Sequence, residues 1–340
     1  MRAGRPVLAL AVGLGLAALA LAAVPVALGA FSSRAENPGN VITAANDFRA
    51  PQVTAVAVGK SAGGATGFVK QGGSYFVYAN VAADTGNPAS GIAGVKADVG
   101  ALTAGATAVE LTAGAFTAGG VSYGYRSAAL SAGTPIAEGA RGFTVSATDN
   151  AGNSAGLGGA VTVDNTAPKA SDVQTANGGS NGLAEQGDSV TLTFSEPVEP
   201  GSILAGWSGS ATSVVVRIAD NSLLGLGLGN DVVQVFNAAN TTALPLGKVD
   251  LGRTDYATGL VGGSIKFGAS GTASTMTMSG STVTIVLGTY EGEGLLGSNR
   301  AAAAGSGTMT WTPTATPYDR AANAMSTTAV GESGAADRDF

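Results

Sequence analysis

Hydrophobic and polar residues alternate with a period of two along much of the chain beyond its first fifty residues. The alternation is clearest at residues 189–198, where Val190, Leu192 and Phe194 are expected on one face of a strand. A period of two is typical of a β-strand with one buried face. The other predicted strands are residues 52–58, 74–81, 92–99, 108–112, 123–130, 142–148, 214–218, 231–236, 274–287 (a hairpin) and 308–312. Short strands between glycine-rich turns predict an all-β sandwich or barrel, with no helix after the N-terminal segment.

A short turn segment closes the last predicted hairpin of the first half. It runs Asp-Asn-Ala-Gly-Asn from Asp149 to Asn153, where Asp149 can accept hydrogen bonds from backbone N–H groups and Gly152 tolerates positive φ. A related segment, Asp-Arg-Ala-Ala-Asn, occupies residues 319–323, and an Ala-Pro pair occurs at both 50–51 and 167–168. The repetition predicts two tandem β-sandwich domains that open and close alike.

The repeats and the N-terminal segment set the predicted boundaries. We expect a signal peptide at 1–30, a linker at 31–49, a first sandwich at 50–165 and a larger second sandwich at 166–335. The extra residues of the second domain are expected in loops at 221–229 and 252–271. Long loops on a β-scaffold often carry binding function, but a tolerated insertion is the favoured interpretation here.

The N-terminal segment has the pattern of a secretory signal peptide. Arg2 and Arg5 precede an almost wholly apolar run at 7–28, and small residues follow, so cleavage is expected near Gly29 or Ala30. The apolar run is also about as long as the ~20 residues that span a membrane, so a retained transmembrane helix is the alternative. The signal peptide is favoured because Gly and Ala dominate the run and no basic stop-transfer cluster follows. We therefore expect a secreted or cell-surface protein that meets the membrane only through an uncleaved signal segment.

Composition excludes several classes of function. The chain has no His and no Cys, which argues against Ser-His hydrolysis, zinc sites with His or Cys ligands, haem and iron–sulfur clusters. Its net charge of −6 argues against nucleic acid and anionic lipid as partners, because both select basic surfaces. We therefore expect no enzyme activity and no cofactor, with Ca²⁺ as the one ion left open.

The residues after the apolar run resemble the processed N-terminus of exported proteins cleaved by the SipW-type signal peptidase, a group that includes the TasA and camelysin fibre proteins. The matching elements are Phe31-Ser32, an Asn-Pro-Gly-Asn turn at 37–40 and Thr43-Ala44. The resemblance covers about residues 7–48 and departs from the usual Thr- or Asp-rich pattern at Arg34. It implies export and leaves the activity open.

Both predicted domains resemble bacterial immunoglobulin-like domains. The likeness is carried by residues 90–97, by Phe143–Ser154, by the closing Asp-Asn-Thr-Ala-Pro at 164–168 and by Phe-Ser-Glu-Pro-Val at 194–198. It implies two tandem immunoglobulin-like β-sandwiches. The absence of Cys means that the disulfide of the antibody-type domain is missing.

Acidic residues near the predicted domain junction are candidate calcium ligands. Asp149, Asp164 and Asn165, with Asp84, could gather the carboxylate and carbonyl oxygens that Ca²⁺ prefers. The alternative is that these residues only form turns, and it is favoured because no loop has EF-hand spacing.

Three further candidate sites carry less weight. Glu196 and Glu199 could be a carboxylate pair of a glycoside hydrolase, but Pro197 and Pro200 end the strand there, so edge positions are favoured. The Gly-Leu-Gly-Leu-Gly run at 225–229 lacks the Lys-Ser/Thr of a phosphate-binding loop.

Trp207 and Tyr256 could stack on a sugar ring, although single aromatic residues are more often found in the core or at its rim.

The function that the sequence favours is a non-catalytic structural or adhesion role outside the cell. The expected partner is a cell-wall or extracellular polymer or a protein, and self-association with another copy of the chain is left open. Two alternatives stay open: a carbohydrate- or cell-wall-binding module, and a fibre subunit that donates a strand to its neighbour.

Overall fold

The computed structural model describes residues 47–86, 88–221, 229–259, 263–293 and 297–340. The predicted signal peptide, its cleavage site near Gly29 and Ala30, and the linker as far as residue 46 lie outside the described residues. Among the described residues, no helix has the length and apolar character needed to cross a membrane.

The described chain is almost entirely β, as the alternating pattern predicts. A single helical turn, α2 (Pro200–Ile203), is the only helix among the described residues. It begins with Pro200, whose fixed φ suits the first position of a helix.

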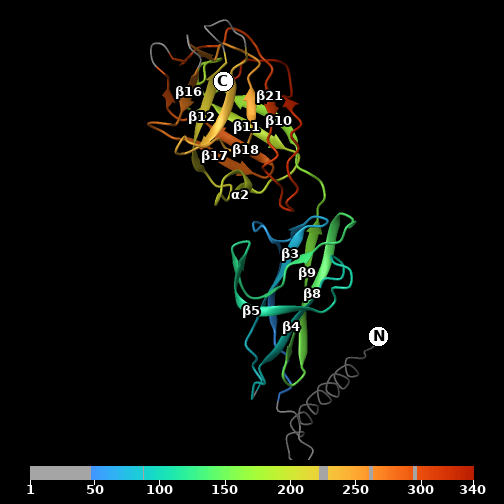
Figure 1. Ribbon diagram of the computed structural model, residues 1–340. Coiled ribbons are helices and arrows are strands. Elements are labelled where there is room, and N and C mark those ends of the chain that lie inside the picture. Colours follow the sequence, from blue (N-terminus) through green and yellow to red (C-terminus); the bar gives the residue numbers. More distant parts are fainter. Residues whose placement is uncertain (1–46, 87, 222–228, 260–262, 294–296) are drawn as a thin grey trace, which may run out of the picture.

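The N-terminal half, residues 47–163, forms a two-layer sandwich (Figure 1). One layer has the strand order β1-β3-β6-β5 and the other β4-β8-β9-β2, and a short pairing of β4 with β5 connects them. Val77, Val145 and Val161 come from both layers and are buried in one shared core. The strands are β1 (Val53–Lys60), β2 (Phe68–Val69), β3 (Ser74–Val81), β4 (Ile92–Asp98), β5 (Val109–Ala118), β6 (Val121–Ser127), β7 (Leu130–Ser131), β8 (Gly139–Asp149) and β9 (Ser154–Val163).

The C-terminal half, residues 170–340, folds around a second and larger core. Its main sheet has the order β10-β11-β18-β17-β12-β13-β14-β21-β22, and β16 and β19 extend from β12. Trp311 and Phe194 meet edge to face at its centre, with ring centroids 5.1 Å apart. The strands are β10 (Ala170–Ala176), β11 (Ser189–Phe194), β12 (Thr212–Asp220), β13 (Val232–Asn237), β14 (Lys248–Asp250), β15 (Ala257–Thr258), β16 (Gly263–Phe267), β17 (Ser274–Ser279), β18 (Thr282–Val286), β19 (Tyr290–Glu291), β20 (Asn299–Arg300), β21 (Thr310–Thr312) and β22 (Val330–Gly331).

The two halves lie end to end, joined by a short extended segment between β9 and β10 (Figure 1). Within this segment Pro168 is buried, and its carbonyl oxygen accepts a hydrogen bond from the N–H of Ser326 at 2.8 Å. The connection is therefore packed against the C-terminal half.

One part of the sequence prediction is wrong. Residues 252–271 were expected to be a loop insertion, but they include β15 and β16, and β16 pairs with β12 from Val216 to Asp220. The insertion thus extends the sheet, because its apolar residues Ile265 and Phe267 are fully buried. Of the other predicted insertion, 221–229, residues 222–228 lie outside the described residues, as does most of the glycine-rich run.

Candidate functional site

The turn between β8 and β9 is built around the carboxylate of Asp149. Its Oδ1 accepts hydrogen bonds from the backbone N–H groups of Ala151 at 2.9 Å and Asn153 at 2.8 Å. Its Oδ2 accepts one from Nδ2 of Asn153 at 2.8 Å. Gly152 has a φ of 92°, which L side chains rarely adopt. The predicted turn is confirmed.

Asp149 belongs to a group of three carboxylates, which we call the polar-end cluster: Asp47, Asp84 and Asp149. One oxygen atom from each residue lies within 4.8 Å of the others. Asp47 accepts hydrogen bonds from the backbone N–H groups of Arg49 at 3.0 Å and Ser90 at 2.9 Å, and these bonds lower the pKa of Asp47. Backbone donors therefore hold the cluster at the end of the N-terminal half.

The turn at Asp319 repeats this geometry in the C-terminal half. Oδ1 of Asp319 accepts hydrogen bonds from the N–H groups of Ala321 and Asn323, both at 2.8 Å, and Oδ2 accepts one from Nδ2 of Asn323 at 2.7 Å. Asp319 also forms a group of three carboxylates with Asp164 and Glu196, again within 4.8 Å. We call this group the junction cluster.

The two clusters are structurally equivalent. In each, the turn asparagine also donates Nδ2 to the carbonyl oxygen of the aspartate where the chain enters the half. Asn153 reaches Asp47 at 3.1 Å, and Asn323 reaches Asp164 at 2.9 Å. Both entry aspartates stand in the pattern Asp-x-x-Ala-Pro, which the sequence repeats at 47–51 and 164–168.

The junction cluster concentrates negative charge in a partly buried place. Burial, followed by the charges of Asp164 and Asp319, raises the pKa of Glu196 to about 7. Burial also raises the pKa of Asp319. At neutral pH a proton therefore offsets part of the charge of this cluster.

Either cluster has the ligand type for a divalent cation. Three converging carboxylates suit Ca²⁺, which takes six to eight oxygen ligands. The turn hydrogen bonds alone already account for the positions of Asp149 and Asp319, in agreement with the interpretation that these residues form turns.

The predicted grouping of Asp149, Asp164 and Asn165 does not occur. Asp149 and Asp164 flank β9 at opposite ends, and a ten-residue strand separates its ends by roughly 33 Å. The side chain of Asn165 instead accepts a hydrogen bond from the N–H of Gln71 at 2.7 Å and donates one to the carbonyl oxygen of Ile136 at 2.9 Å. The prediction failed because it placed Asp149, which precedes β9, close to Asp164 and Asn165, which follow β9.

A buried ion pair joins the two halves beside the junction cluster. Nζ of Lys60 lies 3.4 Å from Oε2 of Glu199, and their side chains are 4% and 13% exposed. Glu199 also accepts a hydrogen bond from the N–H of Ala65 at 3.0 Å. Burial lowers the pKa of Lys60, and the charge of Glu199 opposes that shift. The sequence offered no signal for this pair.

A second lysine makes another contact across the junction. Nζ of Lys70 donates to the carbonyl oxygen of Ala322 at 2.6 Å. The guanidinium of Arg320 lies over the ring of Phe68, 5.7 Å from its centroid. The turn at 319–323 is thus held by the N-terminal half on two sides.

The remaining predicted site residues have structural roles. Glu196 and Glu199 belong to different contacts, the junction cluster and the ion pair with Lys60, so they do not form a catalytic pair. Trp207 is 8% exposed and Tyr256 is fully buried, so neither offers a surface for sugar stacking.

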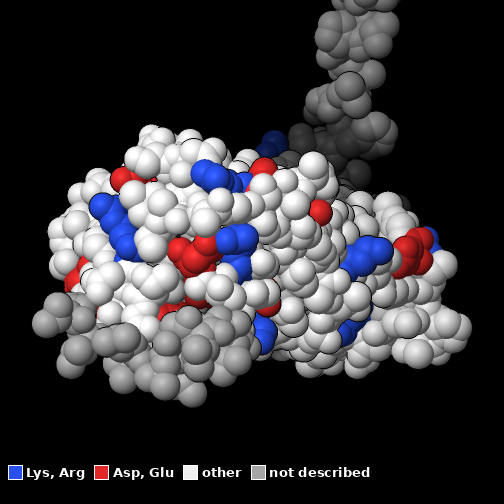
Figure 2. All heavy atoms as spheres, turned by 90° about the horizontal axis from the view of Figure 1, so that it is seen from above, with Lys and Arg blue, Asp and Glu red and all other residues white. Residues whose placement is uncertain are grey.

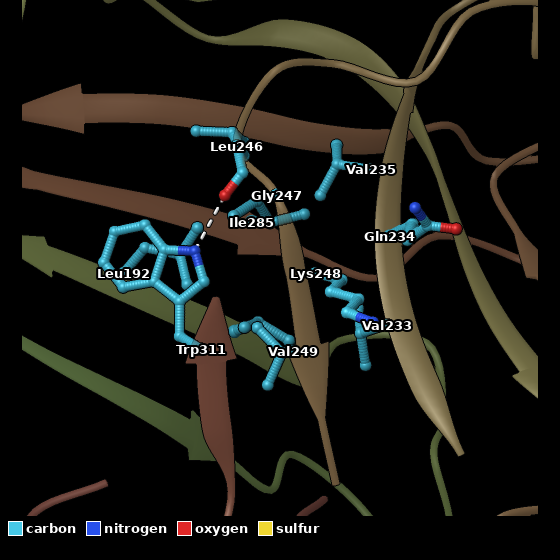
Figure 3. Close-up of a pocket in the computed structure, with 11 residues that line it drawn as sticks. Leu192, Val233, Gln234, Val235, Leu246, Gly247, Lys248, Val249, Ile285 and Trp311 are labelled. Atoms are coloured by element: carbon cyan, nitrogen blue, oxygen red, sulfur yellow. Dashed lines mark hydrogen bonds between the residues drawn. The ribbon is translucent and has the colours of Figure 1, made fainter. Parts of the chain in front are cut away.

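A small gap lies near Trp311 in the C-terminal half, with a volume of about 10 Å³ (Figure 3). The indole Nε1 donates to the carbonyl oxygen of Leu246 at 2.7 Å, and Leu192, Val249 and Ile285 fill the surroundings. A gap of this size has room for about one water molecule and no organic ligand.

A larger hollow, of about 350 Å³, lies on the N-terminal half. Asn80, Phe116, Ser122 and Tyr123 are among the residues that line it. It is formed by β3, β5 and β6, and we call it the β5–β6 hollow. No sequence pattern indicated the hollow, because its residues come together only where β3 and β6 stop pairing.

Two buried carboxylates lie elsewhere in the C-terminal half. In the antiparallel register of β12 and β13, Ala219 pairs with Val232. The residues one step further along, Asp220 and Asp231, therefore stand opposite each other. They are 4% and 0% exposed. Burial is the main cause that raises the pKa of Asp231 to about 7, and the charge of Asp220 adds to it.

A third group of carboxylates, Glu332, Asp337 and Asp339, lies near residue 340. Burial and the charges of Glu332 and Asp337 raise the pKa of Asp339 to about 7. Asp339 accepts a hydrogen bond from the hydroxyl of Tyr256 at 3.4 Å, so it forms part of the packing of that ring.

Charges of both signs are interspersed on the face of the molecule shown in Figure 2. Uncharged surface predominates there, and no broad basic patch is visible among the described residues of that face.

No known protein family matches the chain, and no curated protein is significantly similar to it.

Proposed function

We propose that this protein is a non-catalytic structural or adhesion protein of the cell surface or extracellular space, exported through its N-terminal signal peptide and built of two immunoglobulin-like sandwiches. The observation that carries the proposal is the junction. Buried polar contacts between distant segments fix two sandwiches end to end, which is the construction expected of a load-bearing spacer.

The strand order supports the immunoglobulin-like assignment. In the N-terminal half, β1-β3-β6-β5 face β4-β8-β9, an order that agrees with the ABED and CFG sheets of the constant-type immunoglobulin fold. In the C-terminal half, β10-β11-β18-β17 follow the ABED order. That half departs from the pattern where β13 and β14 stand between β12 and β21.

The polar clusters support a structural role in preference to catalysis. The carboxylates of Asp149 and Asp319 each accept three hydrogen bonds from their own turn. The chain has no His or Cys to serve as base or nucleophile. We therefore assign these carboxylates to turn formation, with Ca²⁺ as the one ion that their chemistry would suit.

Binding of a cell-wall or extracellular carbohydrate is the second candidate function. The β5–β6 hollow favours it, because its lining combines aromatic rings with hydroxyl groups on a surface of the N-terminal half.

Fractionation and N-terminal sequencing of the native protein test the export that the proposal requires. We expect the protein in the surface or extracellular fraction, with a mature N-terminus near Gly29 or Ala30. A cytoplasmic protein that keeps Met1 would contradict the proposal. Pull-down with purified cell walls or peptidoglycan then separates a surface-bound protein from a released one.

A further inference from the structure

The β5–β6 hollow forms where the β5–β6 hairpin leaves the sheet. Strand β3 pairs with β6 at Tyr78 and Ala79. Beyond these residues, hydrogen bonds of the Asn80 side chain replace the backbone pairing. Its Oδ1 accepts the N–H of Gly124 at 2.7 Å, and its Nδ2 donates to the carbonyl oxygen of Ser122 at 2.9 Å. The amide thus bridges strands that have begun to separate.

A β-bulge in β5 widens the same place. The register between β5 and β6 shifts between Ala113 and Phe116, so Gly114 and Ala115 stand opposite Gly124 alone. A bulge leaves one residue without a partner on the neighbouring strand. The ring of Phe116 lies against Gly114, whereas Gly124 has only Asn80 Oδ1 near its Cβ position, at 3.6 Å. The floor of the hollow at Gly124 is therefore peptide backbone that a ligand can approach.

Two aromatic residues line the hollow, of which Phe116 is half-buried and Tyr123 is buried, and neighbouring side chains hold both rings in place. Phe116 packs against the guanidinium of Arg126 at 4.4 Å, and Phe76 packs against the same guanidinium at 4.3 Å. Tyr123 packs against Tyr78, with ring centroids 5.4 Å apart. Side chains that are already fixed lose little conformational entropy when a ligand binds.

The charge of the lining limits the class of ligand. Arg126 is not among the residues that line the hollow, and the lining contains no Asp, Glu, Lys or Arg. Ser122 and Thr117 contribute exposed hydroxyl groups at its rim. A purely apolar occupant would leave these hydroxyls without partners, and a charged occupant would find no counter-charge in the lining.

We infer that the β5–β6 hollow binds a neutral saccharide, with one face of a sugar ring against the half-buried Phe116 and its hydroxyls directed to Ser122, Thr117 and the backbone of the bulge. The C–H bonds on one face of a pyranose carry slight positive charge, which suits the negative face of an aromatic ring. The volume of about 350 Å³ falls in the range of small-ligand sites. The inference deepens the proposed function, on which it rests, by naming the ligand class.

NMR titration of the ¹⁵N-labelled mature protein tests the inference directly. The probes are neutral oligosaccharides (cellopentaose, maltopentaose and chitopentaose) and the acidic pentagalacturonate. We expect at least one neutral probe to shift the amide signals of Gly114 and Gly124. In Phe116→Ala we expect binding of that probe to weaken at least tenfold.

Two glycine variants keep the test valid if Phe116→Ala disturbs the packing of Arg126. A Cβ at Gly124 would have Asn80 Oδ1 as its nearest atom at 3.6 Å, an ordinary contact, so Gly124→Ala fills the floor and preserves the fold. We expect it to weaken binding about fivefold. Gly94→Ala on β4 is the matched control, since nothing lies within 4 Å of its Cβ, and it should bind as the wild type does.

Three outcomes would overturn the inference: no neutral probe binds at 10 mM, pentagalacturonate binds more tightly than any neutral probe, or Gly124→Ala and Phe116→Ala both bind normally. None of these outcomes bears on export, which fractionation and N-terminal sequencing test separately. A failed titration with a normally exported protein therefore refutes the saccharide site alone.

Discussion

At the scale of single residues, the carboxyl group of Asp231 in the C-terminal half is fully buried and only partly hydrogen-bonded. Its Oδ2 accepts the N–H groups of Tyr256 and Ala257, both at 2.9 Å, while its Oδ1 has no hydrogen-bond partner. Asp220 stands opposite it across the β12–β13 pair. Like charges in that position destabilise a sheet, so the protonated form of Asp231 is the favoured one in the folded state.

The raised pKa of Asp231 predicts a specific pH dependence. An unfolded Asp has a pKa near 3.9, whereas Asp231 in the folded protein has one of about 7. Between these values the unfolded state releases the proton and the folded state keeps it, so the free energy of unfolding falls as pH rises, by up to about 1.4 kcal/mol per unit. Asp231→Asn removes this titration.

Urea unfolding at pH 5, 6, 7 and 8 measures the effect. We expect Asp231→Asn to gain stability relative to the wild type as the pH rises, and to exceed it at pH 8. The difference between the two proteins isolates Asp231 from the other carboxyls with raised pKa values. A difference that stays constant from pH 5 to pH 8 would show that Asp231 ionises normally.

The residues of the candidate site were only partly predictable. The turn roles of Asp149 and Asp319 followed from a local motif, because their hydrogen bonds stay within five residues. Asp47 could have been found from the repeated Asp-x-x-Ala-Pro pattern. The partners of Glu196 are distant in sequence within its own half, and the partner of Lys60 is fixed by how the two halves meet, so neither could be predicted.

At the scale of elements, the two closing turns offer an internal comparison. The turn aspartates, Asp149 and Asp319, accept the same three hydrogen bonds, but only the second turn contacts the other half. Hydrogen bonds to a charged group contribute about 1.5–3 kcal/mol each, and they are not additive. Replacement of either aspartate by alanine is expected to cost about 2–4 kcal/mol in its own half.

The two tryptophans make the halves distinguishable, since Trp207 and Trp311 both lie in the C-terminal half. In urea with 1 mM EDTA, Asp319→Ala should lower the midpoint of the tryptophan fluorescence transition. Asp149→Ala should leave that transition in place and lower a transition seen only by far-UV circular dichroism. Asp98→Ala is the control, because the exposed carboxylate of Asp98 accepts one local hydrogen bond, from the N–H of Gly100. Equal effects of all three variants would refute a special role for the turns.

The strands were predictable wherever one face is buried. Alternation located β1, β3, β11 and the β17–β18 hairpin, and Val190, Leu192 and Phe194 are all buried as expected. The length of β5 was underestimated, because residues 112–115 are small or polar and exposed, so that half of the strand carries no alternating pattern. The bulge at Gly114 and Ala115 interrupts the period as well.

At the scale of the whole molecule, the Lys60–Glu199 pair is one of the contacts that join the halves. Removal of one partner of a buried ion pair leaves the other charge unpaired and costs about 3–5 kcal/mol. In Lys60→Ala the charge of Glu199 stays buried and unpaired while the two halves are in contact. The contact is therefore destabilised, and the halves should separate more often. Lys70, whose Nζ contacts the carbonyl oxygen of Ala322 across the junction, then becomes accessible.

Limited trypsin digestion with mass spectrometry measures this opening. We expect cleavage after Lys70 to be at least tenfold faster in Lys60→Ala than in the wild type, together with a broader distance distribution in small-angle X-ray scattering. Lys96→Ala is the matched control, because the Lys96–Glu110 pair is 52% and 65% exposed and contributes little. Cleavage of Lys60→Ala at the wild-type rate would mean that the pair does not hold the junction.

The parallel pairing of β2 with β9 has a mechanical consequence. The N–H of Thr162 donates to the carbonyl oxygen of Gly67, and the N–H of Asp164 donates to that of Val69, both at 2.9 Å. Tension applied along the molecule pulls β9 toward the junction and β1 toward the opposite end, so the force runs along the strands. Hydrogen bonds that lie perpendicular to the pulling direction must break together. When two strands are instead pulled apart from one end, their hydrogen bonds break one at a time. We therefore expect the N-terminal half to resist stretching along the axis on which the two halves are aligned.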